Sequence, residues 1–124
     1  MRPHLLVLDD EEGMCRLLSA FFEAKGYNVT IAIAAVHAMQ LAASESFDAC
    51  IFDVNLAGES GLELLGYFKS NFPHLPVIIY TGVDDENLAE TAMFRGANGF
   101  LRKGEPLENL FEAVKSYVAK ANDE

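Results

Sequence analysis

The chain has 124 residues, of which 9 are Lys or Arg and 19 are Asp or Glu, so its formal net charge is −10. This length suffices for one domain with a buried core, and we expect a single domain over residues 1–124. So acidic a chain would repel a phosphate backbone, which argues against direct nucleic-acid binding. No apolar run approaches a membrane span and the N-terminus lacks signal-peptide features, so we expect a cytoplasmic protein without membrane contact.

Short apolar segments that alternate with helical patterns run through the chain. These short apolar segments predict strands at residues 4–9, 28–33, 48–54, 76–81 and 98–102. Apolar side chains at helical spacing predict a first helix over residues 14–22, which Gly26 is placed to end. Further helical patterns cover residues 35–45, 60–72, 85–95 (capped by Asp84 or Asp85) and 107–118.

Five strands that alternate with five helices predict parallel strands joined by right-handed crossovers. The fold class is therefore α/β, a doubly wound sheet with helices on both faces. The continuous apolar runs LLVL, CIF and VII agree, because central parallel strands are covered on both sides. In such sheets, ligands bind beyond the carboxyl ends of the strands.

Polar residues occupy the predicted carboxyl ends of four of these strands. Asp9 and Asp10 follow the first strand, Asp53 lies in the third, Thr81 ends the fourth and Lys103 follows the fifth. Each is ordinary alone, but together they predict one polar site. Three carboxylates without His or Cys are the oxygen-only ligands that Mg²⁺ prefers, and a cation would let adjacent carboxylates stay ionised. The lysine and the hydroxyl would make the site complementary to a phosphoryl group.

Other candidate groups have structural interpretations. Glu11 and Glu12 suit the first turn of a helix, where the helix dipole favours negative charge. Cys15 and Cys50 lack a CxxC partner and are predicted to be small buried residues. The three histidines show no metal-ligand spacing, so we expect no histidine metal site.

Four stretches, VLDDEEG, FDACIFDVNLAGESGLELL, PVIIYTG and RGANGFLRKGEPLENL, resemble the receiver domain of two-component response regulators over essentially the whole chain. The resemblance implies a (βα)5 fold with strand order 2-1-3-4-5. It also implies that Asp53 accepts a phosphoryl group, in a Mg²⁺-dependent reaction, from a sensor histidine kinase or a histidine phosphotransfer protein. Such a protein is not an enzyme toward other substrates, since it catalyses only its own phosphorylation and dephosphorylation.

The resemblance assigns roles to the metal ligands. Asp10 would hold Mg²⁺ directly, and Asp9 would do so mainly through water. The carboxylate of Asp53 and the main-chain carbonyl of Asn55 would complete the protein ligands.

The resemblance also implies a conformational switch. Thr81 and Lys103 would contact the phosphoryl oxygens, and Phe100 occupies the position of the family's switch aromatic. The implied partners are a downstream effector or output domain and a second copy of the chain, bound through the fourth helix, fifth strand and fifth helix.

Two positions depart from the family pattern. Gly104 follows Lys103 where the family often has proline, and Ala57 stands where a proline commonly precedes a glycine. Neither change removes a chemical group from the site, but both predict a different local backbone.

Three alternatives compete with this interpretation. A flavodoxin-like cofactor binder would need a hydroxyl- and amide-rich phosphate loop after the first strand, where this chain has DDEE. A Mg²⁺-dependent hydrolase or nuclease would need a pair of acids after the third strand and a general base. This chain has Asp53-Val54-Asn55 there and offers no obvious base. A degenerate receiver that acts only as a protein-binding module is disfavoured by the presence of Asp53 and Lys103, and a phosphorylation assay would discriminate.

Overall fold

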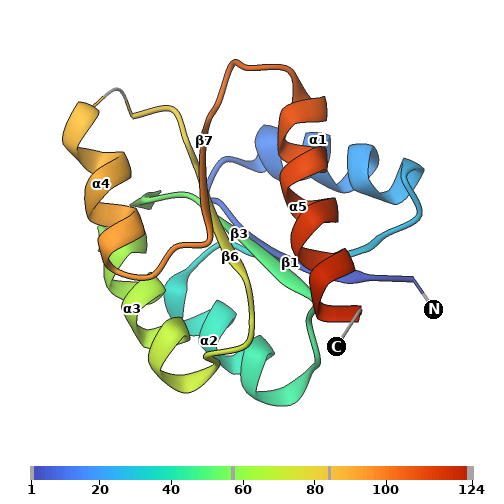
Figure 1. The fold of residues 1–124 in the computed structure, drawn as a ribbon, viewed down its shortest axis with the longest axis horizontal. Helices are drawn as coiled ribbons and strands as arrows, with labels where there is room; N and C mark the ends of the chain where they lie inside the picture. The colour runs from blue at the N-terminus through green and yellow to red at the C-terminus, as the bar shows by residue number, and fades with distance from the viewer. Residues whose placement is uncertain (1, 57, 84, 123–124) are drawn as a thin grey trace.

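The computed structural model describes residues 2–56, 58–83 and 85–122, which form a parallel sheet flanked by helices (Figure 1). The strands of the main sheet are β1 (His4–Leu8), β2 (Asn28–Ala32), β3 (Ala49–Phe52), β6 (Val77–Thr81) and β7 (Gly99–Arg102). The helices are α1 (Glu12–Ala24), α2 (Ala35–Ser44), α3 (Gly61–Asn71), α4 (Glu86–Phe94) and α5 (Leu107–Asn122). Among the described residues, no helix is long and apolar enough to cross a membrane.

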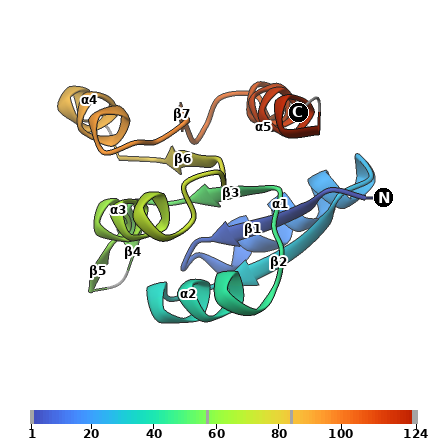
Figure 2. The ribbon, with the colours of Figure 1, turned by 60° about the horizontal axis from the view of Figure 1, so that its bottom comes forward.

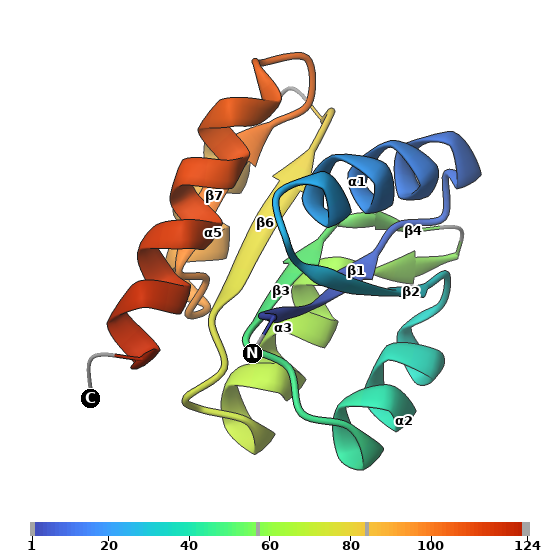
Figure 3. The ribbon, with the colours of Figure 1, turned by 90° about the vertical axis from the view of Figure 1, so that its right-hand side faces the viewer.

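The sheet has the order β2-β1-β3-β6-β7, and every neighbouring pair is parallel (Figure 3). A small antiparallel hairpin, β4 (Asn55–Leu56) with β5 (Glu59–Ser60), follows β3 and accounts for the gap in the numbering. The main sheet therefore has the predicted order 2-1-3-4-5. Figure 2 shows β1, β3 and β6 pointing the same way, so their carboxyl ends meet at one edge.

Two apolar layers hold the helices to the sheet, one on each face. In β1, Leu5 and Val7 pack in the layer under α1 and α5, whereas Leu6 and Leu8 pack in the layer under α2, α3 and α4. All four side chains are at most 1% exposed. Alternate residues of a strand point to opposite faces, so a continuous apolar run supplies both layers.

The ends of the helices follow local chemistry. Asp85 caps α4, because its carboxylate accepts a hydrogen bond from the N–H of Asn87 at 2.9 Å. The other predicted cap, Asp84, lies outside the described residues. Ser60 caps α3 in the same way, and α1 ends before Gly26, whose φ is +93°.

Candidate functional site

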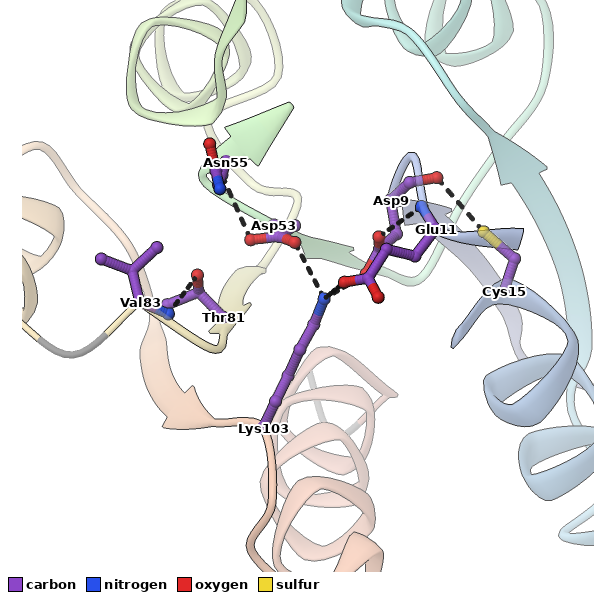
Figure 4. Close-up of polar contacts among 8 residues, drawn as sticks. All are labelled: Asp9, Glu11, Cys15, Asp53, Asn55, Thr81, Val83 and Lys103. Carbon is purple, nitrogen blue, oxygen red and sulfur yellow. Dashed lines mark hydrogen bonds and ion pairs between the residues drawn. The ribbon is translucent and has the colours of Figure 1, made fainter. Parts of the chain in front are cut away.

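The predicted polar residues meet at the carboxyl edge of the sheet. Figure 4 shows Asp9, Asp53, Thr81 and Lys103 of this group. Asp9 and Asp53 are 2% and 5% exposed, whereas Asp10 is exposed. One carboxylate oxygen from each of the three lies within 4.8 Å of the others. Three carboxylates this close repel one another unless a cation or a proton lies between them, so the cluster fits a hard divalent cation such as Mg²⁺.

Lys103 reaches into this cluster from the loop after β7. Its Nζ lies 2.7 Å from Asp9 Oδ2, 2.8 Å from Asp53 Oδ2 and 3.1 Å from Glu11 Oε1. Burial alone would lower the pKa of Lys103, but the hydrogen bonds to the three carboxylates raise that pKa well above its ordinary value. The ammonium therefore stays charged and offsets part of the negative charge of the cluster.

Asp9 is fixed by the first turn of α1. Its Oδ1 accepts a hydrogen bond from the N–H of Glu11 at 2.9 Å, and its main-chain carbonyl accepts one from Cys15 Sγ at 3.2 Å. Burial raises the pKa of Asp9, although its hydrogen bond with Lys103 acts in the opposite direction. Cys15 and Cys50 are both buried free thiols, as predicted.

Asp53 follows β3 directly, and hydrogen bonds on both sides fix it. Its N–H donates to the carbonyl of Leu8 in β1 at 3.0 Å, and its Oδ1 accepts from the N–H of Asn55 at 3.2 Å. Asn55 begins β4 and lines the same cleft. Its role as a carbonyl ligand of a metal stays a prediction, as do the roles of the other site residues.

Thr81 ends β6 and is completely buried beside the cleft. Its Oγ1 accepts a hydrogen bond from the N–H of Val83 at 3.3 Å, and its main-chain carbonyl accepts from the N–H of Lys103 at 2.9 Å. The cleft has a volume of about 520 Å³, enough for a phosphoryl group and a hydrated ion. It is lined by Asp10, Glu11, Asp53, Asn55, Thr81, Gly82, Val83 and Lys103.

Phe100 lies in β7 opposite Ile79, half-buried against the layer under α2, α3 and α4. The guanidinium carbon of Arg102 lies 5.5 Å from the centre of its ring. Nη1 of Arg102 also donates to the carbonyl of Val83 at 2.9 Å. The Arg102 side chain thus contacts both the ring of Phe100 and the loop that follows Thr81.

The sequence did not indicate two parts of this site. Glu11 is the residue directly before α1, at the helix start where its negative charge was expected to be favourable, but the contact of its carboxylate with Lys103 was not predicted. Gly61 packs directly against the backbone of Asp53. The contact between Glu11 and Lys103 has no local sequence signal, because the two residues come together only through the sheet topology. The contact between Gly61 and Asp53 is closed by the β4–β5 hairpin, whose two-residue strands have no period to detect.

The structure describes one of the two positions that depart from the family pattern, Gly104, and not the other, Ala57. Gly104 has φ +97°, a conformation that proline cannot adopt, so the turn after Lys103 is built differently from an X-Pro turn, as predicted. Ala57 lies outside the described residues.

Comparisons with known proteins agree with this geometry. The model of the response regulator receiver domain matches residues 5–115. The transcriptional regulatory protein YkoG of Bacillus subtilis is 32% identical over 115 residues, which cover 93% of this chain and 50% of that protein. The chain spans between 25% and 58% of the length of other curated relatives.

Two solved structures have the same fold as this chain. A response regulator receiver domain protein from Clostridium thermocellum has a TM-score of 0.89 and 29% identity, and the match covers 97% of each chain. The response regulator TrrA of Thermotoga maritima, solved in complex with Mg²⁺ and BeF, has a TM-score of 0.85 and 25% identity, covering 93% of this chain and 98% of that one. By its sequence, its fold and its acidic cluster, the chain belongs to the response regulator receiver domain family.

Proposed function

We propose that residues 1–124 form a receiver domain that accepts a phosphoryl group on Asp53 in a Mg²⁺-dependent reaction. The observation that carries this proposal is the position of the Asp53 carboxylate, which lies 2.8 Å from the ammonium of Lys103 and within the three-carboxylate cluster. A carboxylate is a competent nucleophile toward phosphorus when positive charge offsets the charge on the incoming group.

In the reaction, an oxygen of Asp53 attacks the phosphorus of a phosphorylated histidine. The new O–P bond forms as the N–P bond breaks, and the imidazole leaves with the bonding electron pair. The product is an acyl phosphate, which water hydrolyses to regenerate the carboxylate. The chain thus catalyses its own phosphorylation and dephosphorylation and no reaction of another substrate.

Specific side chains of the cleft would support each part of this step. Asp10, Asp9, Asp53 and the carbonyl of Asn55 would hold Mg²⁺, which supplies charge neutralisation at the phosphoryl oxygens. Lys103 offers N–H donors to a phosphoryl oxygen, and the Thr81 hydroxyl offers one more after it turns toward the cleft. The Mg²⁺ and BeF bound to TrrA are consistent with this use of the fold.

The output would be a change of surface around α4, β7 and α5, produced by Thr81 and Phe100. The implied partners are a sensor histidine kinase or histidine phosphotransfer protein, an effector or output domain, and a second copy of the chain, all in the cytoplasm. Exposed apolar side chains at the end of α4 support a contact there, since Met93 is 48% and Phe94 is 93% exposed.

The deciding experiment is treatment with Mg²⁺ and acetyl phosphate, followed by intact mass spectrometry. The wild type should gain one phosphate, and Asp53→Asn should gain none. Equal labelling of the two proteins would refute the assignment of Asp53. No labelling of the folded wild type by acetyl phosphate or by phosphoramidate would favour a receiver that acts only as a protein-binding module.

A further inference from the structure

Three carboxylates saturate the ammonium of Lys103. A lysine ammonium has three N–H donors, and its three acceptors here are Asp9 Oδ2, Asp53 Oδ2 and Glu11 Oε1, at 2.7, 2.8 and 3.1 Å. The Lys103 side chain is only 11% exposed, whereas that of Glu11 is 66% exposed. Glu11 therefore binds the ammonium from the solvent side of the cleft.

The three acceptors differ in what else they would bind. The oxygens of Asp9 and Asp53 belong to the cluster that fits a metal ion, and Asp53 is also the proposed phosphoryl acceptor. Glu11 is outside that cluster. Its backbone is nevertheless held in place, because its N–H donates to Asp9 Oδ1 at 2.9 Å and its carbonyl accepts the first hydrogen bond of α1 from Cys15.

We propose that Glu11 is a positioning residue for Lys103 in phosphoryl transfer, an inference that rests on the proposed function. A metal ion and a phosphoryl group together compete for the oxygens of Asp9 and Asp53 that now accept from Lys103. The contact with Glu11 survives that exchange and keeps the ammonium at the cleft. Without it, the flexible four-carbon stem of the lysine allows the ammonium to leave the site.

Two substitutions at position 11 separate this contact from the charge of Glu11. Glu11→Gln removes the charge but keeps an amide oxygen that can accept from Lys103, whereas Glu11→Ala removes both. A difference between these variants that also appears in the Lys103 ammonium signal therefore reports the loss of the contact and not the loss of the charge. Glu12→Ala is the matched control, because Glu12 has the same charge one residue further on and pairs with Arg16 at the surface.

The experiment measures the rate of labelling by acetyl phosphate with Mg²⁺, together with the NMR signal of the Lys103 ammonium in the Mg²⁺–beryllofluoride complex. Glu11→Ala should be labelled about twofold to fivefold more slowly than Glu11→Gln, the range expected for a partly exposed charge-assisted contact. The ammonium signal should persist in Glu11→Gln and in Glu12→Ala but be lost to fast proton exchange in Glu11→Ala.

Two results would overturn the inference and are distinguishable from each other. If Glu11→Ala and Glu11→Gln are labelled equally fast and show the same Lys103 signal, Glu11 is only a surface acid while the proposed function stands. If the wild type is not labelled by any donor, the proposed function fails and the positioning role fails with it.

Discussion

Gly61, the first residue of α3, packs directly against the main chain of Asp53. A Cβ atom on Gly61 would overlap the carbonyl oxygen of Asp53 and would lie 2.7 Å from the Cα of Val54. The N–H of Gly61 also donates to the carbonyl of Val54 at 3.0 Å. The position of the phosphoacceptor candidate therefore depends on the absence of a side chain at residue 61.

Gly61→Ala should lower the free energy of unfolding by about 1–3 kcal/mol, because the backbone around Asp53 has to shift to admit the methyl group. Gly66→Ala is the matched control, since a Cβ there meets nothing within 4 Å and lies inside the same helix. In Gly66→Ala the free energy of unfolding should rise by about 0.5–1 kcal/mol, because Ala has a higher helix propensity than Gly. Urea denaturation measures both values, and a loss of stability in the control with none in Gly61→Ala would contradict this account.

Much of the fold follows from periodicity in the sequence. The predicted strands at residues 4–9 and 76–81 match β1 (His4–Leu8) and β6 (Val77–Thr81) to within one residue at each end, because apolar runs between turn residues are a local signal. The β4–β5 hairpin was missed, since two-residue strands have no period to detect. The contact of Glu11 with Lys103 joins residues 92 positions apart, and nothing near either residue indicates it.

Millimolar Mg²⁺ should raise the free energy of unfolding, because it binds the folded carboxylate cluster and not the unfolded chain. The gain is about 1.4 kcal/mol when free Mg²⁺ is ten times its dissociation constant. Asp10→Ala should abolish most of this gain. Thermal unfolding with and without Mg²⁺ is the measurement, and an identical gain in Asp10→Ala would show that the ion binds elsewhere.

Lys103→Met should be less stable than the wild type by about 3 kcal/mol without metal, because two buried carboxylates lose the cation between them. Mg²⁺ should stabilise this variant more than it stabilises the wild type. Lys103 and the ion would share the oxygens of Asp9 and Asp53, so removing the lysine removes a competing positive charge. If Mg²⁺ raises the free energy of unfolding equally in the two proteins, the lysine and the ion do not share these ligands.

Stability should fall in alkaline solution because buried acids resist ionisation in the folded state. Burial raises the pKa of the Cys50 thiol and of Tyr80 above their ordinary values of 9.0 and 10.0. Above these values the unfolded chain releases protons that the folded chain retains, so the free energy of unfolding decreases with pH. Each such proton contributes a slope of up to about 1.4 kcal/mol per pH unit.

Cys50→Ala should therefore show a shallower loss of stability above about pH 9 than the wild type. Ile51→Val is the control, because it also removes buried volume from β3 but leaves the titratable groups in place. Urea denaturation at several pH values gives the slopes. If Cys50→Ala keeps the slope of the wild type, the thiol does not contribute to the pH dependence.

The last prediction concerns the path from Thr81 to Phe100. The Thr81 hydroxyl accepts from the N–H of Val83, the Val83 carbonyl accepts from Arg102, and the Arg102 guanidinium lies over the ring of Phe100. We expect that, when the Thr81 hydroxyl turns toward a phosphoryl oxygen, the N–H of Val83 loses its acceptor and the loop moves. Arg102 would then transmit this movement to the ring of Phe100, which has no hydroxyl group to anchor it. Two packing states of the loop would thus be linked to two states of the ring.

Beryllofluoride with Mg²⁺ should shift the backbone resonances of residues 85–111 and the ring resonances of Phe100 in the wild type. Thr81→Ala should blunt all of these shifts while Asp53 still binds the mimic. Arg102→Met should keep the shift at Val83 and lose most of the shift at the Phe100 ring, because it removes the guanidinium without opening the metal site. An undiminished Phe100 shift in Arg102→Met would show that the ring responds to Thr81 through packing alone, and shifts confined to the metal site in every protein would show that no such path operates.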